Sequence, residues 1–204
     1  RHHGGQWRRC IVKQGILLAA GFSRRFGTNK LLQPLADGIP MALIAARHLR
    51  AAVPNVLAVV NPGDPLLAQL LAEDGFLVTV CPRAEDGMGT SLAWAVRQVP
   101  QASAWVVALA DMPFIRSETI TQVADAIERP MTLAAPVFHG RRGHPVGFGQ
   151  AYFERLTQLT GDEGARSILR DHAEQVRWLA CEDPGIVADI DTPADLHHVG
   201  AFGR

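Results

Sequence analysis

Five short apolar runs, separated by stretches with helical spacing, constrain the fold of this chain more than any other feature. The runs are Gly15–Ala20, Val56–Val60, Phe76–Cys81, Trp105–Ala110 and Met131–Pro136. Almost every position in them is apolar, as expected for strands that are covered by protein on both faces. The helical stretches between them are Met41–Ala51, Pro65–Ala72, Thr90–Val99 and Glu118–Glu128. This alternation predicts an α/β fold, in which a mostly parallel sheet carries helices on both faces.

The sequence after the fifth run is less regular. Its pieces are, in order, a Gly- and Arg-rich excursion at His139–Phe148, a helical piece near Ala165–Arg170, and apolar segments at Val176–Ala180 and Ile186–Ile190. An Asp-Pro-Gly turn at 183–185 separates the two apolar segments. Thr192 as an N-cap and Pro193 in the first turn predict the start of a terminal helix.

Length and charge set the class of protein. A chain of 204 residues suits one domain with a sizeable core. We expect residues 15–204 to form this domain and interpret residues 1–14 as a leader or tag-like segment. Zero formal net charge argues against a nucleic-acid or membrane-surface partner, and no apolar run approaches the roughly 20 residues of a membrane helix. The three cysteines are too widely spaced for a zinc site or disulfide framework, so a cytoplasmic protein is expected.

The segment Leu17–Leu35 leaves the first apolar run and at once becomes cationic. It reads LLAAGFSRRFGTNKLLQPL, with Arg24, Arg25 and Lys30 close to two glycines. Glycines after a strand let backbone N–H groups approach phosphates, and the basic side chains add charge and hydrogen-bond donors. The spacing differs from that of a Walker P-loop. We interpret the loop as a phosphate site, the alternative being an exposed basic turn.

Two acidic segments lie at predicted strands, one directly after a strand and the other along one. Asp111 stands directly after the run that ends at Ala110, and α/β sheets bind ligands at the carboxyl ends of their strands. Magnesium prefers one or two carboxylates together with phosphate oxygens, so Asp111 is a candidate ligand; the alternative is a helix N-cap. Asp189 and Asp191 alternate along an expected strand, so only one of them would face a given site. The alternative there is that Asp191 or Thr192 caps the last helix.

Two polar islands complete the candidates. Gly87, Gly89 and Ser91 precede a predicted helix, which suits the close approach of a base or ribose as well as a plain helix start. Arg142 and His144 lie in the excursion RRGHPVGF. A single histidine is more often structural than catalytic, so a substrate role for His144 is the less common of two interpretations.

Together these segments resemble a known family. LAAGFSRRFGTNK is similar to the signature loop of the MobA-like nucleotidyltransferases. ADMPFI, RGHPVGF, LTGDEGAR and DIDTPADL follow in the order seen in the molybdenum cofactor cytidylyltransferase branch. The resemblance covers about residues 16–198 and implies a Rossmann-like, three-layer nucleotidyltransferase fold. It also implies transfer of a nucleoside monophosphate from an NTP, with Mg²⁺ and with release of pyrophosphate.

The resemblance also assigns roles to individual residues. The catalytic residues that it implies are Arg25, Lys30 and Asp111. The residues that it implies for nucleotide binding are Ala19, Ala20, Gly21, Ser23, Arg24, Arg25, Gly27, Lys30, Gly89 and Ser91. The implied metal ligands are Asp111 and Asp191, and the implied acceptor-side residues are Arg142 and His144.

The branch determines the expected substrates. Guanylyl-transferring relatives tend to carry Leu-Ala-Gly-Gly and then Asp-Lys, whereas this chain has Ala20 before Gly21 and Asn29 before Lys30. Both differences favour CTP. The branch implies a molybdopterin or molybdenum cofactor acceptor, with transient contact to a molybdenum hydroxylase or its maturation factor. Three alternatives stay open: GTP or another NTP as donor, another small phosphate as acceptor, or a cofactor carrier without catalysis.

Overall fold

The computed structural model describes residues 12–22, 29–192 and 194–195. Its strands are β1 (Lys13–Ala19), β2 (Val56–Val60), β3 (Leu77–Val80), β4 (Ala104–Leu109), β5 (Leu133–Phe138), β6 (Arg141–Arg142), β7 (Val146–Gly149) and β8 (Val176–Ala180). Its α-helices are α1 (Met41–Ala52), α2 (Pro65–Glu73), α3 (Met88–Gln98), α4 (Ser117–Ala126), α5 (Phe153–Thr157) and α6 (Arg166–Asp171). The five predicted strands and the four predicted helices between them all occur, with ends shifted by a few residues. Strand β1 begins two residues before the expected start of the domain.

The strands form one sheet in the order β3-β2-β1-β4-β7-β5-β6, with β8 paired to β5. The pairs β1–β2, β1–β4, β2–β3 and β5–β8 are parallel. Strand β7 runs antiparallel between β4 and β5, and it comes from the apolar end of the predicted excursion. The expectation of a mostly parallel sheet is therefore confirmed, with an antiparallel insertion that the sequence did not indicate.

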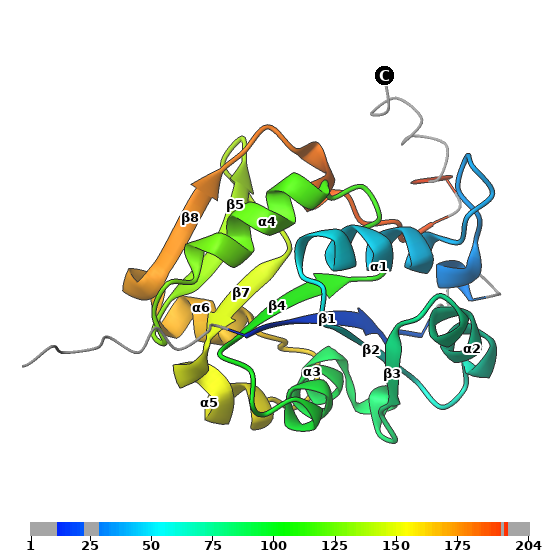
Figure 1. Ribbon diagram of the computed structural model, residues 1–204, viewed down its shortest axis with the longest axis horizontal. Coiled ribbons are helices and arrows are strands. Elements are labelled where there is room, and N and C mark those ends of the chain that lie inside the picture. The colour runs from blue at the N-terminus through cyan, green and yellow to red at the C-terminus, as the bar shows by residue number, and fades with distance from the viewer. Residues whose placement is uncertain (1–11, 23–28, 193, 196–204) are drawn as a thin grey trace, which may run out of the picture.

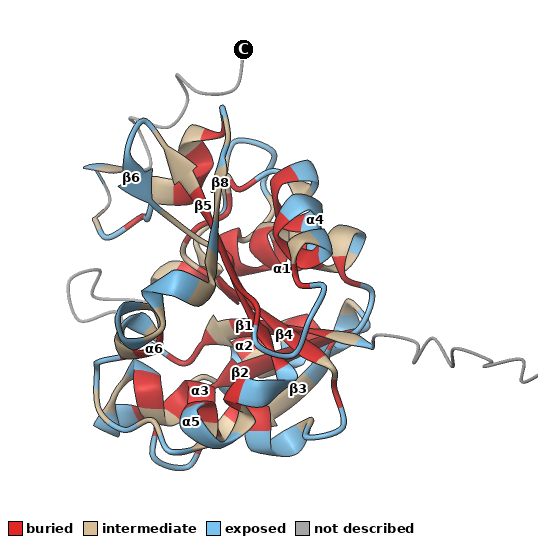
Figure 2. Ribbon diagram, turned by 90° about the vertical axis from the view of Figure 1, so that its left-hand side faces the viewer, coloured by how far each residue is buried: buried red, intermediate tan, exposed pale blue. Residues whose placement is uncertain are grey.

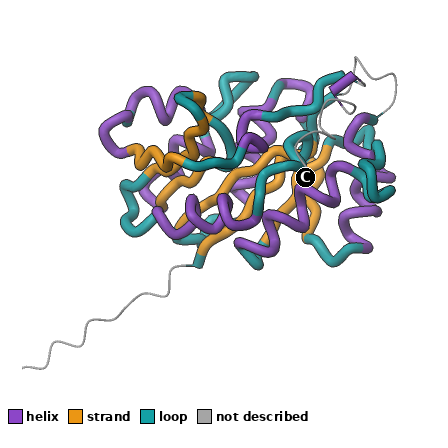
Figure 3. The backbone as a smooth tube through the Cα atoms, turned by 90° about the horizontal axis from the view of Figure 1, so that it is seen from above, coloured by secondary structure: helices purple, strands orange, loops and turns teal. Residues whose placement is uncertain are grey.

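Helices cover both faces of the sheet, as predicted (Figure 1). Successive strand residues face opposite sides, so that Leu17 and Val106 pack under α1, α2 and α4, while Ile16 and Trp105 pack against α3, α5 and α6. The buried positions are concentrated in the strands and on the helix faces turned toward them (Figure 2). Seen from above, the strands lie side by side in the middle of the molecule, between the helices (Figure 3). None of the helices in the described ranges is long and apolar enough to cross a lipid bilayer.

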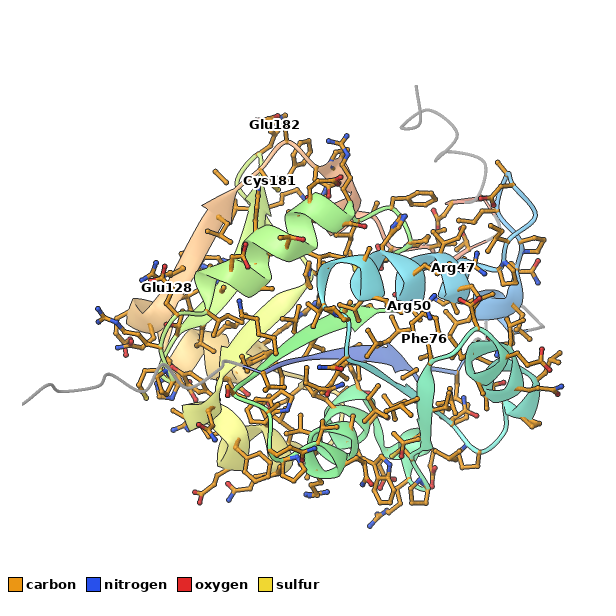
Figure 4. All side chains as sticks on the ribbon, viewed as in Figure 1. Arg47, Arg50, Phe76, Glu128, Cys181 and Glu182 are labelled. Atoms are coloured by element: carbon orange, nitrogen blue, oxygen red, sulfur yellow. The ribbon has the colours of Figure 1, made fainter. Side chains whose placement is uncertain are left out.

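Strand β3 is an exception to the prediction that both faces are covered. Leu77 is 69% exposed and Val80 is 45% exposed, because β3 is the last strand at this edge of the sheet. Two arginines of α1 hold the segment that precedes β3 against this helix. The Arg47 guanidinium donates two hydrogen bonds to Asp74, and the Arg50 guanidinium lies 4.0 Å from the centre of the Phe76 ring (Figure 4).

The segment before Asp191 is a buried turn and not the expected strand. Residues Pro184–Val187 form a 3-10 helix, and residues 188–192 have no regular structure. Asp183 is buried and its carboxylate accepts hydrogen bonds from the backbone N–H of Gly185, the backbone N–H of Arg116 and the hydroxyl of Thr119. This cap ties the turn to the start of α4. The turn therefore fixes the position, beside the sheet, of Asp189 and Asp191, which follow it in the sequence.

The predicted terminal helix is described only at its start. Residues 194 and 195 are helical, and Pro193 and the residues from 196 onward lie outside the described part. The Asp195 carboxylate accepts hydrogen bonds from the backbone N–H of Asp191 and from the backbone N–H and hydroxyl of Thr192. The hydroxyl of Thr192 therefore donates to Asp195. The cap that is observed at the start of this helix is formed by the Asp195 carboxylate, which accepts hydrogen bonds from the residues that precede it.

Candidate active site

A cavity of about 380 Å³ lies at the carboxyl ends of β1 and β4. This is the edge of a parallel sheet where α/β proteins bind ligands, and the volume is within the usual range for small-molecule sites. Residues predicted from separate sequence segments meet in its wall: Ala20, Gly21, Lys30, Ser91 and Asp111. The structure therefore brings half of the ten described candidate site residues into one cavity wall.

Lys30 occupies the acidic side of this cavity. It starts a 3-10 helix over Lys30–Leu32, which Asn29 caps by accepting a hydrogen bond from the backbone N–H of Leu31. Its Nζ lies 3.0 Å from Oδ2 of Asp111, 3.1 Å from Oδ1 of Asp191 and 2.8 Å from the carbonyl oxygen of Ile190. Burial acts to lower the pKa of Lys30, but the two carboxylates outweigh it and raise the pKa, so the ammonium is charged.

Asp111 lies two positions after the last residue of β4, Leu109, and does not cap a helix. The next helix, α4, begins at Ser117 with Arg116 as its N-cap residue. The backbone carbonyl of Asp111 accepts a hydrogen bond from the backbone N–H of Ile190, and its carboxylate pairs with Lys30. Of the two interpretations of Asp111, the helix cap is therefore wrong, and a carboxylate at the cavity remains.

Asp189 and Asp191 do not face opposite sides. No strand forms over these residues. Asp189 is exposed at the surface, but partial desolvation, a hydrogen bond with Asp191 and repulsion from Asp191 raise the pKa of Asp189. The nearby charge of Asp111 acts in the same direction. Asp189 therefore belongs to the same acidic cluster. The expectation of opposite faces is wrong because the chain turns irregularly where the alternation of an extended strand was expected.

The acidic pair has the chemistry of a magnesium site. Asp111 and Asp191 both reach the Nζ of Lys30, so their carboxylates converge on one small volume. Within the described residues, no group of three or more His, Cys, Asp and Glu side chains could hold a metal ion. A protein contribution of two carboxylates suits Mg²⁺, which commonly takes its other ligands from phosphate and water. The residues present fit the ion that the resemblance implies.

The glycines at the start of α3, Gly87 at the N-cap and Gly89 in the first turn, pack against a distant loop. Gly87 has a φ of +126°, and a Cβ there would overlap the backbone of Gly161. The backbone N–H of Gly89 donates to the carbonyl of Gly161 over 2.7 Å, and a Cβ on Gly89 would stand 2.8 Å from that oxygen. This contact places Asp162 next to Gly87, and both residues line the cavity. Asp162 belongs to the family segment LTGDEGAR, but no role was expected for it, because its place in the wall depends on a contact between distant loops.

Not all candidates line the cavity. Ala19 is buried in the core beneath α1, whereas its neighbour Ala20 is in the cavity wall. Ser23, Arg24, Arg25 and Gly27 lie outside the described residues. Their expected roles on the nucleotide therefore stay predictions.

The two acceptor-side candidates stand apart from the described cavity wall. Arg142 lies in β6 with its guanidinium 4.4 Å from the centre of the Trp178 ring. His144 donates its backbone N–H to the carbonyl of Ile186. Burial, with a smaller effect of Arg166, lowers the pKa of His144 to about 4 against the opposing charge of Asp111. The imidazole is therefore neutral near pH 7 and lies within the electric field of Asp111.

Comparison with known proteins shows the family of the chain. A model of the MobA-like NTP transferase domain matches residues 15–176. The purine catabolism protein PucB of Bacillus subtilis (strain 168) is 31% identical over 195 residues, which span 91% of this chain and 94% of PucB. The likeness therefore extends over almost the full length of both proteins.

Solved structures with a similar fold cover almost the whole chain. Rv0371c of Mycobacterium tuberculosis H37Rv superposes with a TM-score of 0.79 at 27% identity, over 93% of this chain and 97% of that one. A manganese complex of Rv0371c superposes with a TM-score of 0.73 at 25% identity. A nucleotidyl transferase from Methanothermobacter thermautotroptrophicus has a TM-score of 0.81 over 94% of this chain at 16% identity, a likeness of fold. The expected nucleotidyltransferase fold is confirmed.

Proposed function

Because the chain belongs to the MobA-like NTP transferase family, we propose that it transfers CMP from CTP to the phosphate of molybdopterin or of molybdenum cofactor, releasing pyrophosphate. The observation that carries the proposal is the cavity at the ends of β1 and β4, where Gly21, Ser91, Lys30 and Asp111 converge. Different parts of this wall suit a small polar ring such as cytosine, anionic phosphates near Lys30, and a cation near the Asp111 carboxylate. The proposed products are the cytosine dinucleotide of molybdopterin or of molybdenum cofactor, and pyrophosphate.

The nucleotide has a definite orientation in this proposal. Ala20 and Ser91 lie beside the base and ribose, and Gly21 offers a backbone without a side chain to the phosphates. Lys30 and Arg25 neutralise charge that develops on the leaving pyrophosphate, Lys30 as a point charge and Arg25 through two parallel hydrogen bonds. Catalysis then depends on alignment and charge neutralisation.

Asp111 and Asp191 would hold the divalent metal. When bound there, Mg²⁺ would neutralise charge on phosphate oxygens and help to orient them. The manganese complex of Rv0371c supports a divalent ion in this family. For these two carboxylates to accept a metal, the Lys30 ammonium has to leave its place between them.

The acceptor needs little activation by the protein. A phosphate monoester has a second pKa of about 6, so its attacking oxygen is already anionic at pH 7. This oxygen attacks the α-phosphorus of CTP in line, and the bond from that phosphorus to the pyrophosphate oxygen breaks. His144 and Arg142, on the side of β6 and β7, would face the acceptor. The neutral state of His144 is compatible with an anionic group nearby.

CTP is the proposed donor because of the wall beside the base. Ala20 is buried and lines the cavity, and its methyl group narrows the space there. Cytosine is the smaller ring, so it fits this wall better than guanine. We place the reaction in the cytoplasm, with transient transfer of the product to a molybdenum hydroxylase or its maturation factor.

The test is a pyrophosphate assay with each of the four NTPs, Mg²⁺ and molybdopterin. We expect release with CTP, weaker release with GTP, and none when molybdopterin is omitted. Equal or better use of GTP would overturn the CTP assignment. Release with a sugar phosphate in place of molybdopterin would overturn the acceptor assignment. Binding of the pterin without pyrophosphate release from any NTP would favour a cofactor carrier.

A further inference from the structure

Lys30 is an unusual residue in this chain. The chain contains 20 basic residues, yet Lys13 and Lys30 are its only lysines. Lys13 lies in β1 and pairs with Asp125 at 3.5 Å, far along the strand from the cavity. Lys30 has 16% of its side chain exposed, and its Nζ contacts two carboxylates and a carbonyl oxygen. Within the described ranges, three oxygen acceptors therefore hold this ammonium at the acidic wall.

The position of this ammonium conflicts with the binding of a metal ion. A divalent cation bound by Asp111 and Asp191 would lie within a few ångströms of the Lys30 Nζ, because that Nζ contacts both carboxylates. Two cations at such a separation repel one another, and the lysine removes negative charge that the metal would use. Metal and ammonium therefore compete for the same oxygens.

A polyphosphate can resolve this competition. Lys30 and Gly21 line the same cavity as Asp111, so phosphate oxygens placed there would offer the ammonium new anionic acceptors. When Lys30 turns to those oxygens, its ammonium no longer competes with the metal for the two carboxylates. Metal binding and polyphosphate binding then strengthen one another, since coupling between two binding events is reciprocal.

We propose that Lys30 is an internal counter-ion that keeps divalent metal off Asp111 and Asp191 until a nucleoside triphosphate draws its ammonium away. The inference rests on the proposed function, because it takes these two carboxylates as the metal ligands. It adds an order of events: the free protein binds metal weakly, and the nucleotide creates the metal site.

The first test measures Mn²⁺ binding to the nucleotide-free protein. Electron paramagnetic resonance quantifies the Mn²⁺ ions that remain free in solution. Lys30→Met should bind Mn²⁺ at least about tenfold more tightly than the wild type, within the usual range of coupling between sites. Lys30→Arg keeps the charge and should bind as weakly as the wild type. Lys13→Met is the matched control, since it removes the other lysine, and should also leave Mn²⁺ binding unchanged.

Two results would overturn the counter-ion role. One is an unchanged or weaker Mn²⁺ affinity of Lys30→Met. The other is a gain that persists in the double variant Lys30→Met/Asp111→Asn, because the tighter binding would then come from elsewhere. Neither measurement involves turnover, so a failure here leaves the proposed transfer reaction standing. Conversely, a gain in Mn²⁺ affinity together with no pyrophosphate release from any NTP would overturn the reaction and leave the counter-ion role standing.

The second test observes Lys30 itself. Protein labelled with ¹³C at the lysine Cε should give two signals from its two lysines, and Lys13→Met assigns them. We expect Mg²⁺ alone to leave the Lys30 signal in place and CTP with Mg²⁺ to move it. A shift with Mg²⁺ alone as large as that with CTP and Mg²⁺ would contradict the proposed order.

Discussion

A substitution at Gly21 separates an effect on the stability of the fold from an effect on ligand binding. Gly21 is exposed and lines the cavity, and a Cβ added there would meet no atom within 4 Å. Gly21→Ala should therefore change the free energy of unfolding by no more than about 0.5 kcal/mol. It should lower kcat/KM for CTP about tenfold, because the new methyl group occupies space that we assign to phosphate. Thermal unfolding and steady-state kinetics measure the two effects.

Gly143 is the contrasting position for this experiment. A Cβ on Gly143 would collide with the carbonyl group of Ile186, so Gly143→Ala should destabilise the fold whatever its effect on activity. If Gly21→Ala keeps the wild-type kcat/KM for CTP, the backbone at Gly21 does not approach the nucleotide.

The Asp111 carboxylate should be required for turnover and dispensable for folding. Its side chain is 24% exposed, and its ion partner Lys30 retains Asp191. Asp111→Asn should lower kcat at least about 100-fold, the scale of one preorganised electrostatic contact, while circular dichroism shows a folded protein. Asp125→Asn, which changes an exposed partner of Lys13, is the control and should retain activity. Turnover of Asp111→Asn within a few-fold of the wild type would remove Asp111 from the catalytic set.

At the scale of elements, the turn at 183–187 should matter as much for stability as a piece of the core. The Asp183 carboxylate satisfies two backbone N–H groups and the Thr119 hydroxyl. Asp183→Ala would leave these buried donors without their partner, at about 1–3 kcal/mol for an unsatisfied group. We expect a loss of about 3 kcal/mol in the free energy of unfolding, measured by urea denaturation.

The neighbouring Glu182 provides the control for this turn. Its side chain is 89% exposed and lies 3.8 Å from the His139 imidazole, an exposed contact (Figure 4). Glu182→Ala should change stability by no more than about 0.5 kcal/mol, as is usual at the surface. Equal effects of the two substitutions would mean that the Asp183 cap does not hold the turn.

At the scale of the whole molecule, a bound nucleotide should stabilise the fold. A ligand that binds the folded state alone adds about 2.7 kcal/mol at a concentration of 100 Kd. For a protein of this size that corresponds to an increase in Tm of about 5–10 °C. Differential scanning fluorimetry with CTP and Mg²⁺ should show this increase, and GTP at the same concentration should give a smaller one. No increase with any NTP would contradict a nucleotide site in the cavity.

The sequence by itself determined the order of strands and helices along the chain. Apolar runs and helical spacing are local properties, and each element follows from a short stretch of residues. It also determined that Lys30 and Asp111 would meet near one edge, because residues that follow parallel strands gather at the carboxyl ends of the sheet. The family resemblance added the chemistry that such residues serve.

Only the tertiary structure decided which charges pair and which turns replace strands. The Nζ of Lys30 contacts Asp111 and Asp191, which lie 81 and 161 positions away in the sequence. Asp189 joins them because the Asp183 cap bends the chain into a 3-10 helix, where alternation suggested a strand. Strand β7 enters the sheet antiparallel between β4 and β5. These features depend on contacts between distant segments, and a local pattern of residues carries no information about its distant partners.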